Sequence, residues 1–401
     1  VAFHASATSQ RGRSSGRAVN PPRPCQRVYC AGNQSGCGAT RLLIEQAEAR
    51  GEPPEDPMQL FRVLNIFWNA NAAAFNGDVM RELATQALAL AEKQGAALPL
   101  VAAHHLMGAS LVWTGEIVEG RTHLDQSIAF YDPAENPLTA TYLGAHQAAG
   151  LSVRSVTLWL LGYPQAALAD ADQALADTRA IDRAAPLIEA LAYSCFLHIL
   201  CGEHLIANAL VDELIALAHE KDAFYLKALG MSVQGWLFAL TGNASDAVRA
   251  LTSGLSAYRS TGATQAVLFF RSYLARSYAE LGQFDDAWHC IDEALAAIEK
   301  TKERVWEAEV NRIAGQIPLK SPEPDAAKAE AYFERALAVA RAQQAKSWEL
   351  RAAMSMARLW RDQGKRDEAR ELLAPVYGWF TEGFDTLDLK EAKALLDELR
   401  A

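Results

Sequence analysis

The chain has 401 residues, of which 50% are hydrophobic and 8% aromatic, a composition ordinary for a soluble globular protein. Residues 1–41 carry six arginines and no acid, whereas the rest of the chain holds 32 basic and 48 acidic side chains, a net charge of −16. A body this acidic repels phosphate backbones, which argues against nucleic acid as a partner, and the absence of 18 consecutive uncharged apolar residues argues against a membrane span.

The six cysteines do not resemble the framework of a secreted disulfide-rich protein. Three fall within residues 1–41 at loose spacings, and three fall in segments with a helical pattern. We therefore expect a reducing, cytoplasmic location.

Residues 1–41 are rich in Gly, Ser, Pro and Arg and show no apolar periodicity, which predicts a disordered basic tail. Three interpretations stay open: a misread start, a native tail, or an organelle-targeting segment, since such segments are also Arg-rich and poor in acids. Residues 39–51 (ATRLLIEQAEARG) have the pattern of the second helix of a repeat whose first helix is missing. We place a single repeat domain over 42–401.

A repeated frame occupies most of this domain. In most units an apolar segment ends at a glycine, and a small residue follows five positions later, as in TGNASDA (241–247) and LGQFDDA (281–287). One unit has Pro324 in place of the glycine, and the unit at Gly77 is degenerate. The first slot falls at 77, 115, 162, 202, 242, 282, 324 and 364, so the intervals are 38, 47, 40, 40, 40, 42 and 40 residues. This regularity predicts an all-α, TPR-like right-handed α-solenoid of about eight helical hairpins.

Each position of the frame has a structural role in the hairpin. Glycine adopts the left-handed conformation that ends the first helix, and a second amphipathic helix follows. The small residue lets the two helices approach closely, and an apolar residue near the thirteenth position packs toward the next unit. Three further segments stand out: an extra loop at 131–150, a proline-stiffened turn at 317–325, and a charged amphipathic helix at 385–400 that caps the solenoid.

Two polar clusters invite a metal-site or catalytic interpretation. Asp285, Asp286, His289 and Cys290 are replaced in sister repeats by unrelated residues, so we interpret them as helix surface and core. In CFLHILCGEH (195–204), the potential ligands Cys195, His198, Cys201 and His204 recur every third residue and rotate around a helix, so they do not share one face. We predict no metal, no cofactor and no catalytic residue, and leave a hydrolase or metal-dependent enzyme that uses the 195–204 region as an alternative.

The C-terminal segment ARLWRDQGKRDEARELLAPVYGWFTEGFDTLDLKEAKALLDEL (357–399) closely resembles the end of a bacterial signalling family. Its members join a class III adenylate/guanylate cyclase domain, an AAA-type ATPase domain and a long TPR-like region. The segments at 158–168, 282–316 and 329–364 resemble that region as well. The resemblance implies a right-handed α-solenoid that regulates the catalytic domains. Nothing in 1–41 corresponds to the family's phosphate-binding loop or cyclase aspartates, so no catalytic residue is carried over.

These observations predict a non-catalytic module that binds a protein or peptide on the concave face made by the first helices. The alternative is a truncated or decayed fragment without a role of its own. Aromatic residues on those helices are the candidate anchors for a partner: Trp68, Trp113, Trp159, Trp236, Tyr273 and Trp360.

Overall fold

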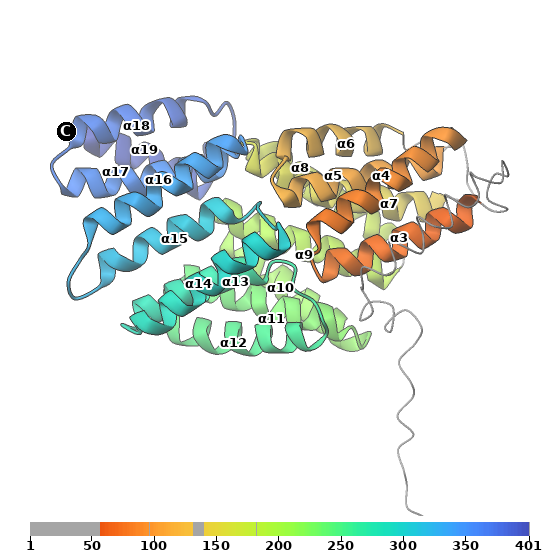
Figure 1. The fold of residues 1–401 in the computed structure, drawn as a ribbon, viewed down its shortest axis with the longest axis horizontal. Coiled ribbons are helices and arrows are strands. Elements are labelled where there is room, and N and C mark those ends of the chain that lie inside the picture. Colours follow the sequence, from red (N-terminus) through yellow and green to blue (C-terminus); the bar gives the residue numbers. More distant parts are fainter. Residues whose placement is uncertain (1–56, 96, 131–139, 182, 401) are drawn as a thin grey trace, which may run out of the picture.

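The computed structural model describes residues 57–95, 97–130, 140–181 and 183–400. The expectations for 1–41 and for a helix over 39–51 lie outside these residues. In the described part the chain forms 17 α-helices (Figure 1): α3 (Pro57–Ala73), α4 (Gly77–Gln94), α5 (Ala97–Thr114), α6 (Ile117–Ala129), α7 (Ala140–Leu160), α8 (Pro164–Ala180), α9 (Ala184–Cys201), α10 (His204–Glu220), α11 (Phe224–Leu240), α12 (Ala244–Ser260), α13 (Val267–Glu280), α14 (Phe284–Thr301), α15 (Glu307–Lys320), α16 (Ala326–Ala342), α17 (Lys346–Asp362), α18 (Arg366–Gly378) and α19 (Leu387–Arg400).

The helices pair in chain order, each odd-numbered helix packing against the even-numbered helix that follows it. This arrangement gives eight hairpins, from α3–α4 to α17–α18, with α19 closing the end (Figure 1). The turn between the two helices of a hairpin contains the predicted slot of the frame in seven of the eight hairpins. The exception is the slot at Gly77, which is the first residue of α4. The prediction of an all-α, TPR-like repeat fold is therefore confirmed.

The small residue of the frame lies where the two helices of a hairpin touch. Ala167, Ala207, Ala247 and Ala287 are all fully buried. At the corresponding Gly120, a Cβ atom would lie 2.6 Å from Cγ2 of Val112, closer than two carbon atoms approach in proteins. Close approach of the helices thus accounts for the small side chain, as the sequence predicted.

Two boundaries differ from the sequence-based expectation. The segment 131–150 is not a loop throughout, because α7 begins at Ala140 and its Ala-rich, proline-free sequence continues as helix. The expected turn at 317–325 begins later, because α15 extends to Lys320 and includes Pro318. Proline is tolerated there because its missing N–H removes only one hydrogen bond from the last turn of the helix.

The superhelix returns on itself, so that later loops pack on the ends of earlier first helices. Thr264 and Ser347 hydrogen-bond through their hydroxyls to carbonyls of Ala74 and Trp159, at sequence separations of 190 and 188 residues. Two backbone contacts repeat this pattern: Thr264 N donates to Ala73 O at 2.8 Å, and Arg304 N donates to Trp113 O at 3.1 Å. In addition, the backbone N–H of Ala166 on α8 donates to the carboxylate of Glu382, in the loop before α19, at 3.0 Å.

Helices α5 and α9 have the length and hydropathy of membrane-spanning segments, although 78% and 67% of their residues are buried within the protein. Both are first helices with neighbours on several sides. Burial between helices accounts for their apolar composition.

Candidate functional site

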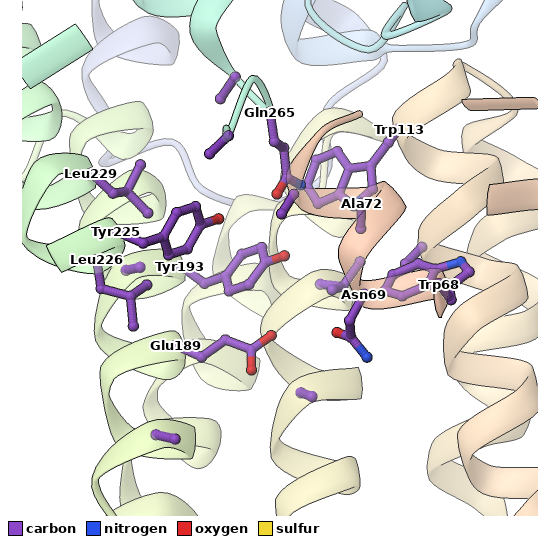
Figure 2. A pocket seen from close by; sticks show the side chains of 18 of the residues that line it. Trp68, Asn69, Ala72, Trp113, Glu189, Tyr193, Tyr225, Leu226, Leu229 and Gln265 are labelled. Atoms are coloured by element: carbon purple, nitrogen blue, oxygen red, sulfur yellow. The ribbon is translucent and has the colours of Figure 1, made fainter. Parts of the chain in front are cut away.

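The concave face of the superhelix contains a cavity of about 760 Å³. Its walls come mainly from α3, α5, α7, α9 and α11, all first helices of their hairpins (Figure 2). Tyr258 of α12 and the loops that follow α12 and α14 complete them. The volume lies within the range of small-molecule and short-peptide pockets.

Aromatic side chains form much of the wall and hold one another in place. Trp113 stacks against Tyr193 and Trp306, with ring centroids 6.3 and 6.0 Å away. Tyr225 stacks on Tyr258 at 5.0 Å, and the Tyr258 hydroxyl donates to the Tyr225 hydroxyl at 3.1 Å. A wall fixed in this way loses little conformational entropy when a ligand binds.

The charges around the cavity are of one sign. Its lining residues include Glu189 and Glu303 but no lysine or arginine. His105 and His146 also line it, and burial lowers the pKa of their imidazoles to about 3 and about 4, so both are neutral at physiological pH.

Glu189 projects from α9 into the cavity, with its carboxylate directed toward the space in front of Asn69 on α3 (Figure 2). It makes no hydrogen bond or ion pair with any residue that the structure describes. Its side chain is exposed to solvent. The carboxylate is therefore available to a ligand.

Glu303, in contrast, already has partners. Its Oε1 accepts hydrogen bonds from the backbone N–H of Ala266 at 2.7 Å and from Nε1 of Trp306 at 3.1 Å. Burial raises the pKa of the carboxyl group, and the two hydrogen bonds lower it. Burial is the larger effect, so the pKa is about 8. Glu303 thus joins the loop after α14 to the loop before α13 mainly in its protonated form at neutral pH.

Glu303→Gln should remove a pH dependence of stability. Between its unfolded pKa of 4.5 and its folded pKa of about 8, the native state keeps a proton that the unfolded chain has lost. Unfolding free energy must therefore fall as pH rises through this window, by at most about 1.4 kcal/mol per unit. Glutamine mimics the protonated acid, so urea unfolding at pH 5.5, 7 and 9 should show a flatter profile for Glu303→Gln.

The exposed Glu299, on the preceding helix, is the matched control. Glu299→Gln should leave the wild-type profile unchanged. Parallel profiles for wild type and Glu303→Gln would show that Glu303 is ionised in the folded protein at neutral pH.

The structure brings two of the six candidate anchors, Trp68 and Trp113, to the cavity. Trp236 and Tyr273 are completely buried between helices, where Trp236 packs on Phe269 with centroids 4.8 Å apart. Trp159 is buried edge-on against Trp348. Trp360 is half-buried and donates from Nε1 to Glu330 at 2.7 Å. These four lie outside the cavity wall and support the fold.

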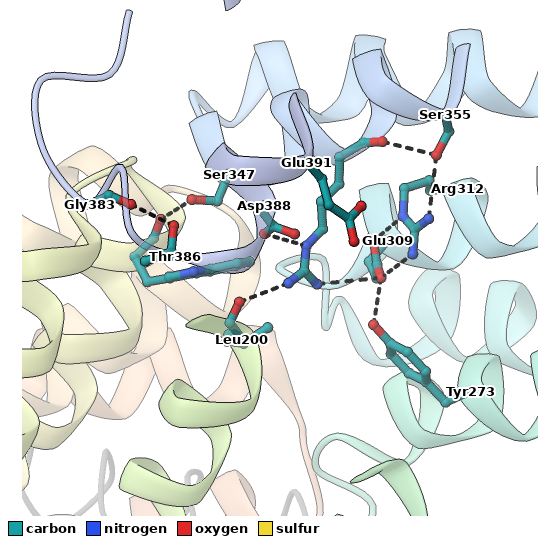
Figure 3. Close-up of polar contacts among 12 residues, drawn as sticks. Leu200, Tyr273, Glu309, Arg312, Ser347, Ser355, Gly383, Thr386, Asp388 and Glu391 are labelled. Atoms are coloured by element: carbon teal, nitrogen blue, oxygen red, sulfur yellow. Dashed lines mark hydrogen bonds and ion pairs between the residues drawn. The ribbon is translucent and has the colours of Figure 1, made fainter. Parts of the chain in front are cut away.

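Behind the cavity, buried polar groups join α13, α15 and α17 (Figure 3). Glu309 is fully buried and accepts hydrogen bonds from the Tyr273 hydroxyl at 2.6 Å and from Nε and Nη2 of Arg312, both at 2.7 Å. Burial opposes ionisation, but Arg312 and Arg351 outweigh it and hold the pKa of Glu309 below its usual value. Glu309 is therefore a paired anion in the core.

Arg351 extends this network across the superhelix (Figure 3). Its Nε donates to Asp388 on α19 at 2.7 Å, and its Nη2 donates to the carbonyl of Leu200 at the end of α9 at 2.9 Å. The guanidinium also lies 5.1 and 5.2 Å from the ring centroids of Trp159 and Trp348. One side chain thus ties the C-terminal helices to the first half of the chain.

The polar clusters singled out in the sequence have ordinary surroundings. Cys195 and Cys201 are buried, and burial raises the pKa of both thiols, while Nδ1 of His198 lies 2.5 Å from Glu203. Asp285 and Asp286 occupy the first turn of α14. Across the part of the chain that the structure describes, no three His, Cys, Asp or Glu residues are arranged to hold a metal ion.

Sequence reasoning missed Glu189, Tyr193 and Tyr225. A signal for Glu189 exists, because it is the only Asp, Glu, Lys or Arg residue in the 18 residues of α9. An isolated acid on a first helix that is otherwise apolar points toward a solvent-filled cavity or a paired core site. The tyrosines carry no comparable signal, since aromatic residues also fill the core.

Comparison with known proteins identifies the fold. No protein-family model matches the sequence, and no curated protein sequence matches it. Among solved structures, a Rap protein complexed with the competence and sporulation factor has a TM-score of 0.59 and 12% identity, over 94% of this chain and 96% of that one. The apo quorum sensor NprR from B. thuringiensis has a TM-score of 0.51 and 13% identity, over 88% and 96% of the two chains. Aspartyl phosphate phosphatase F from Bacillus subtilis has a TM-score of 0.50 and 11% identity, over 94% and 98%.

Proposed function

We propose that this protein is a non-catalytic, cytoplasmic regulatory module that binds a short peptide in the concave cavity. The observation that carries this proposal is the cavity itself, which is walled by the first helices of five successive hairpins. Fixed aromatic faces offer apolar contacts, and the amides of Asn65, Asn69 and Gln265 offer hydrogen-bonding groups of the kind that recognise an extended backbone.

The fold comparisons support this proposal by analogy. A Rap protein that shares the fold over nearly its whole length was crystallised with the competence and sporulation factor, and NprR is a quorum sensor. The resemblance of 357–399 to cyclase–ATPase signalling proteins suggests the output: the peptide-bound module would regulate nucleotide cyclase or ATPase domains. A change in the packing of one superhelical turn on the next would carry the signal.

The proposal is tested by screening acetylated, amidated pentapeptides against the full chain and measuring hits by calorimetry. We expect at least one peptide to bind saturably at micromolar concentration. Ala149→Phe, which places a ring in the cavity from α7, should weaken binding by about tenfold or more, equivalent to about 1.4 kcal/mol.

The matched control is Ala176→Phe on α8, the second helix of the same hairpin, where the side chain is exposed outside the cavity. It should bind with the wild-type affinity. No saturable peptide in the library, or equal binding by both phenylalanine variants, would rule out a peptide site in this cavity.

A further inference from the structure

The cavity combines an unpaired carboxylate with a wall that contains no cation. Of its two acidic residues, Glu303 is buried and occupied by the Ala266 and Trp306 donors. Glu189 makes no hydrogen bond or ion pair within the described residues. The two histidines of the lining are neutral at physiological pH, so no lining residue supplies a cation to Glu189.

The Glu189 side chain is exposed to solvent, so a ligand that fills the cavity would cover its carboxylate and remove part of its hydration shell. This removal is costly unless the ligand supplies a partner. A ligand cation that reaches Glu189 recovers this cost and adds a charge-assisted hydrogen bond. The aromatic wall favours the same ligand, since Tyr193 lies one helical turn from Glu189, Tyr225 faces it from α11, and Trp68 lies across the cavity on α3 (Figure 2).

A bare metal ion does not fit this arrangement. The described residues contain no group of three or more His, Cys, Asp or Glu side chains placed to coordinate one. A divalent cation held by a single carboxylate would keep most of its water and gain little from aromatic faces. An organic cation on a flexible stem satisfies both the carboxylate and the apolar wall.

We propose that the cavity selects peptides with a basic side chain, arginine or lysine, whose charged head pairs with Glu189 while its stem packs on the tyrosine and tryptophan wall. This inference rests on the proposed function and adds a specificity-determining residue to it. An acidic peptide would instead meet Glu189 with no cation nearby to compensate, so the cavity excludes it.

The test uses acetylated, amidated pentapeptides of alanine and leucine with one arginine at each position in turn, and the same peptides with citrulline in its place. Citrulline keeps the shape of arginine without its charge. We expect at least one arginine peptide to bind the wild-type chain about 10- to 100-fold more tightly than its citrulline twin. In Glu189→Gln this ratio should fall to within about twofold, mainly through weaker binding of the arginine peptide.

Glu213→Gln is the matched control, because Glu213 lies on α10, the second helix of the same hairpin, where it pairs with Arg179 at the surface. It should keep the wild-type preference for arginine. Glu189→Gln is isosteric, and thermal unfolding of the variant checks that it remains folded.

The outcomes separate the two proposals. Saturable binding with equal affinity for arginine and citrulline peptides overturns the role of Glu189 and leaves the peptide site standing. If Glu189→Gln keeps the wild-type preference for arginine over citrulline, the role of Glu189 is likewise overturned and the peptide site remains. Absence of saturable binding by every peptide overturns the proposed function, and this inference with it.

Discussion

Arg351→Met should lower the free energy of unfolding by about 3–5 kcal/mol, because it leaves the largely buried carboxylate of Asp388 without its counter-charge and the buried carbonyl of Leu200 without its donor. Asp388 loses its 2.7 Å hydrogen bond from Arg351, and the carbonyl of Leu200 loses its donor at 2.9 Å. Glu309 keeps Arg312 and Tyr273, so the cost falls on the contact between the C-terminal helices and α9. Urea denaturation at pH 7 measures the effect.

The same pair of helices provides the control. Arg358 on α17 pairs with Glu391 on α19 at 2.7 Å, but both side chains are exposed. Arg358→Met should cost no more than about 1 kcal/mol. In addition, Asp388→Leu should restore part of the stability of Arg351→Met, since it removes the uncompensated carboxylate. Equal losses from the two arginine variants would show that Arg351 contributes no more than a surface pair.

Gly202→Ala should destabilise the fold by more than Gly242→Ala, although the two glycines have nearly the same positive φ, +82° and +84°. At position 242 a Cβ would meet nothing within 4 Å, so only the backbone cost of about 1–2 kcal/mol applies. At position 202 a Cβ would lie 2.3 Å from Cβ of Leu387, an atom held by its own backbone. Relief of this clash requires α19 to move, which adds about 1–3 kcal/mol.

Chemical denaturation of the two variants measures the difference. Leu387→Gly in the Gly202→Ala background should recover part of the added loss and none of the loss in Gly242→Ala. If Gly202→Ala and Gly242→Ala unfold at the same denaturant concentration, the close approach of α19 to the end of α9 does not persist in solution.

The sequence predicted the features that each hairpin encodes by itself. The glycine at the turn and the alanine five residues later are determined by contacts within one hairpin. The helix end at Gly242 and the close helix contact at Ala247 could therefore be predicted without the rest of the chain. The concave position of the first helices follows from the same repeat.

The cavity could not be assembled from the sequence in this way. Which first-helix residues meet across it depends on the summed rotations between successive hairpins, and no single period encodes that sum. The pairing of Thr264 with Ala74, 190 residues away, illustrates the difficulty. Tryptophans gave an ambiguous signal for the same reason: Trp113 lines the cavity and Trp236 fills the core, yet both occupy first helices.

Contacts between successive turns of the superhelix change how this chain should fold. In an open array each repeat contacts only its neighbours. The stability of the array is then nearly the sum of the stabilities of the repeats and of the interfaces between them, and the terminal repeats can unfold one at a time. Here Thr264 and Arg304 bind carbonyls at the ends of α3 and α5, and Arg351 binds the end of α9. Loss of a terminal hairpin therefore also exposes a distant one. The repeats gain the all-or-none cooperativity of a globular domain, and the cavity exists only once both halves of the chain are in place.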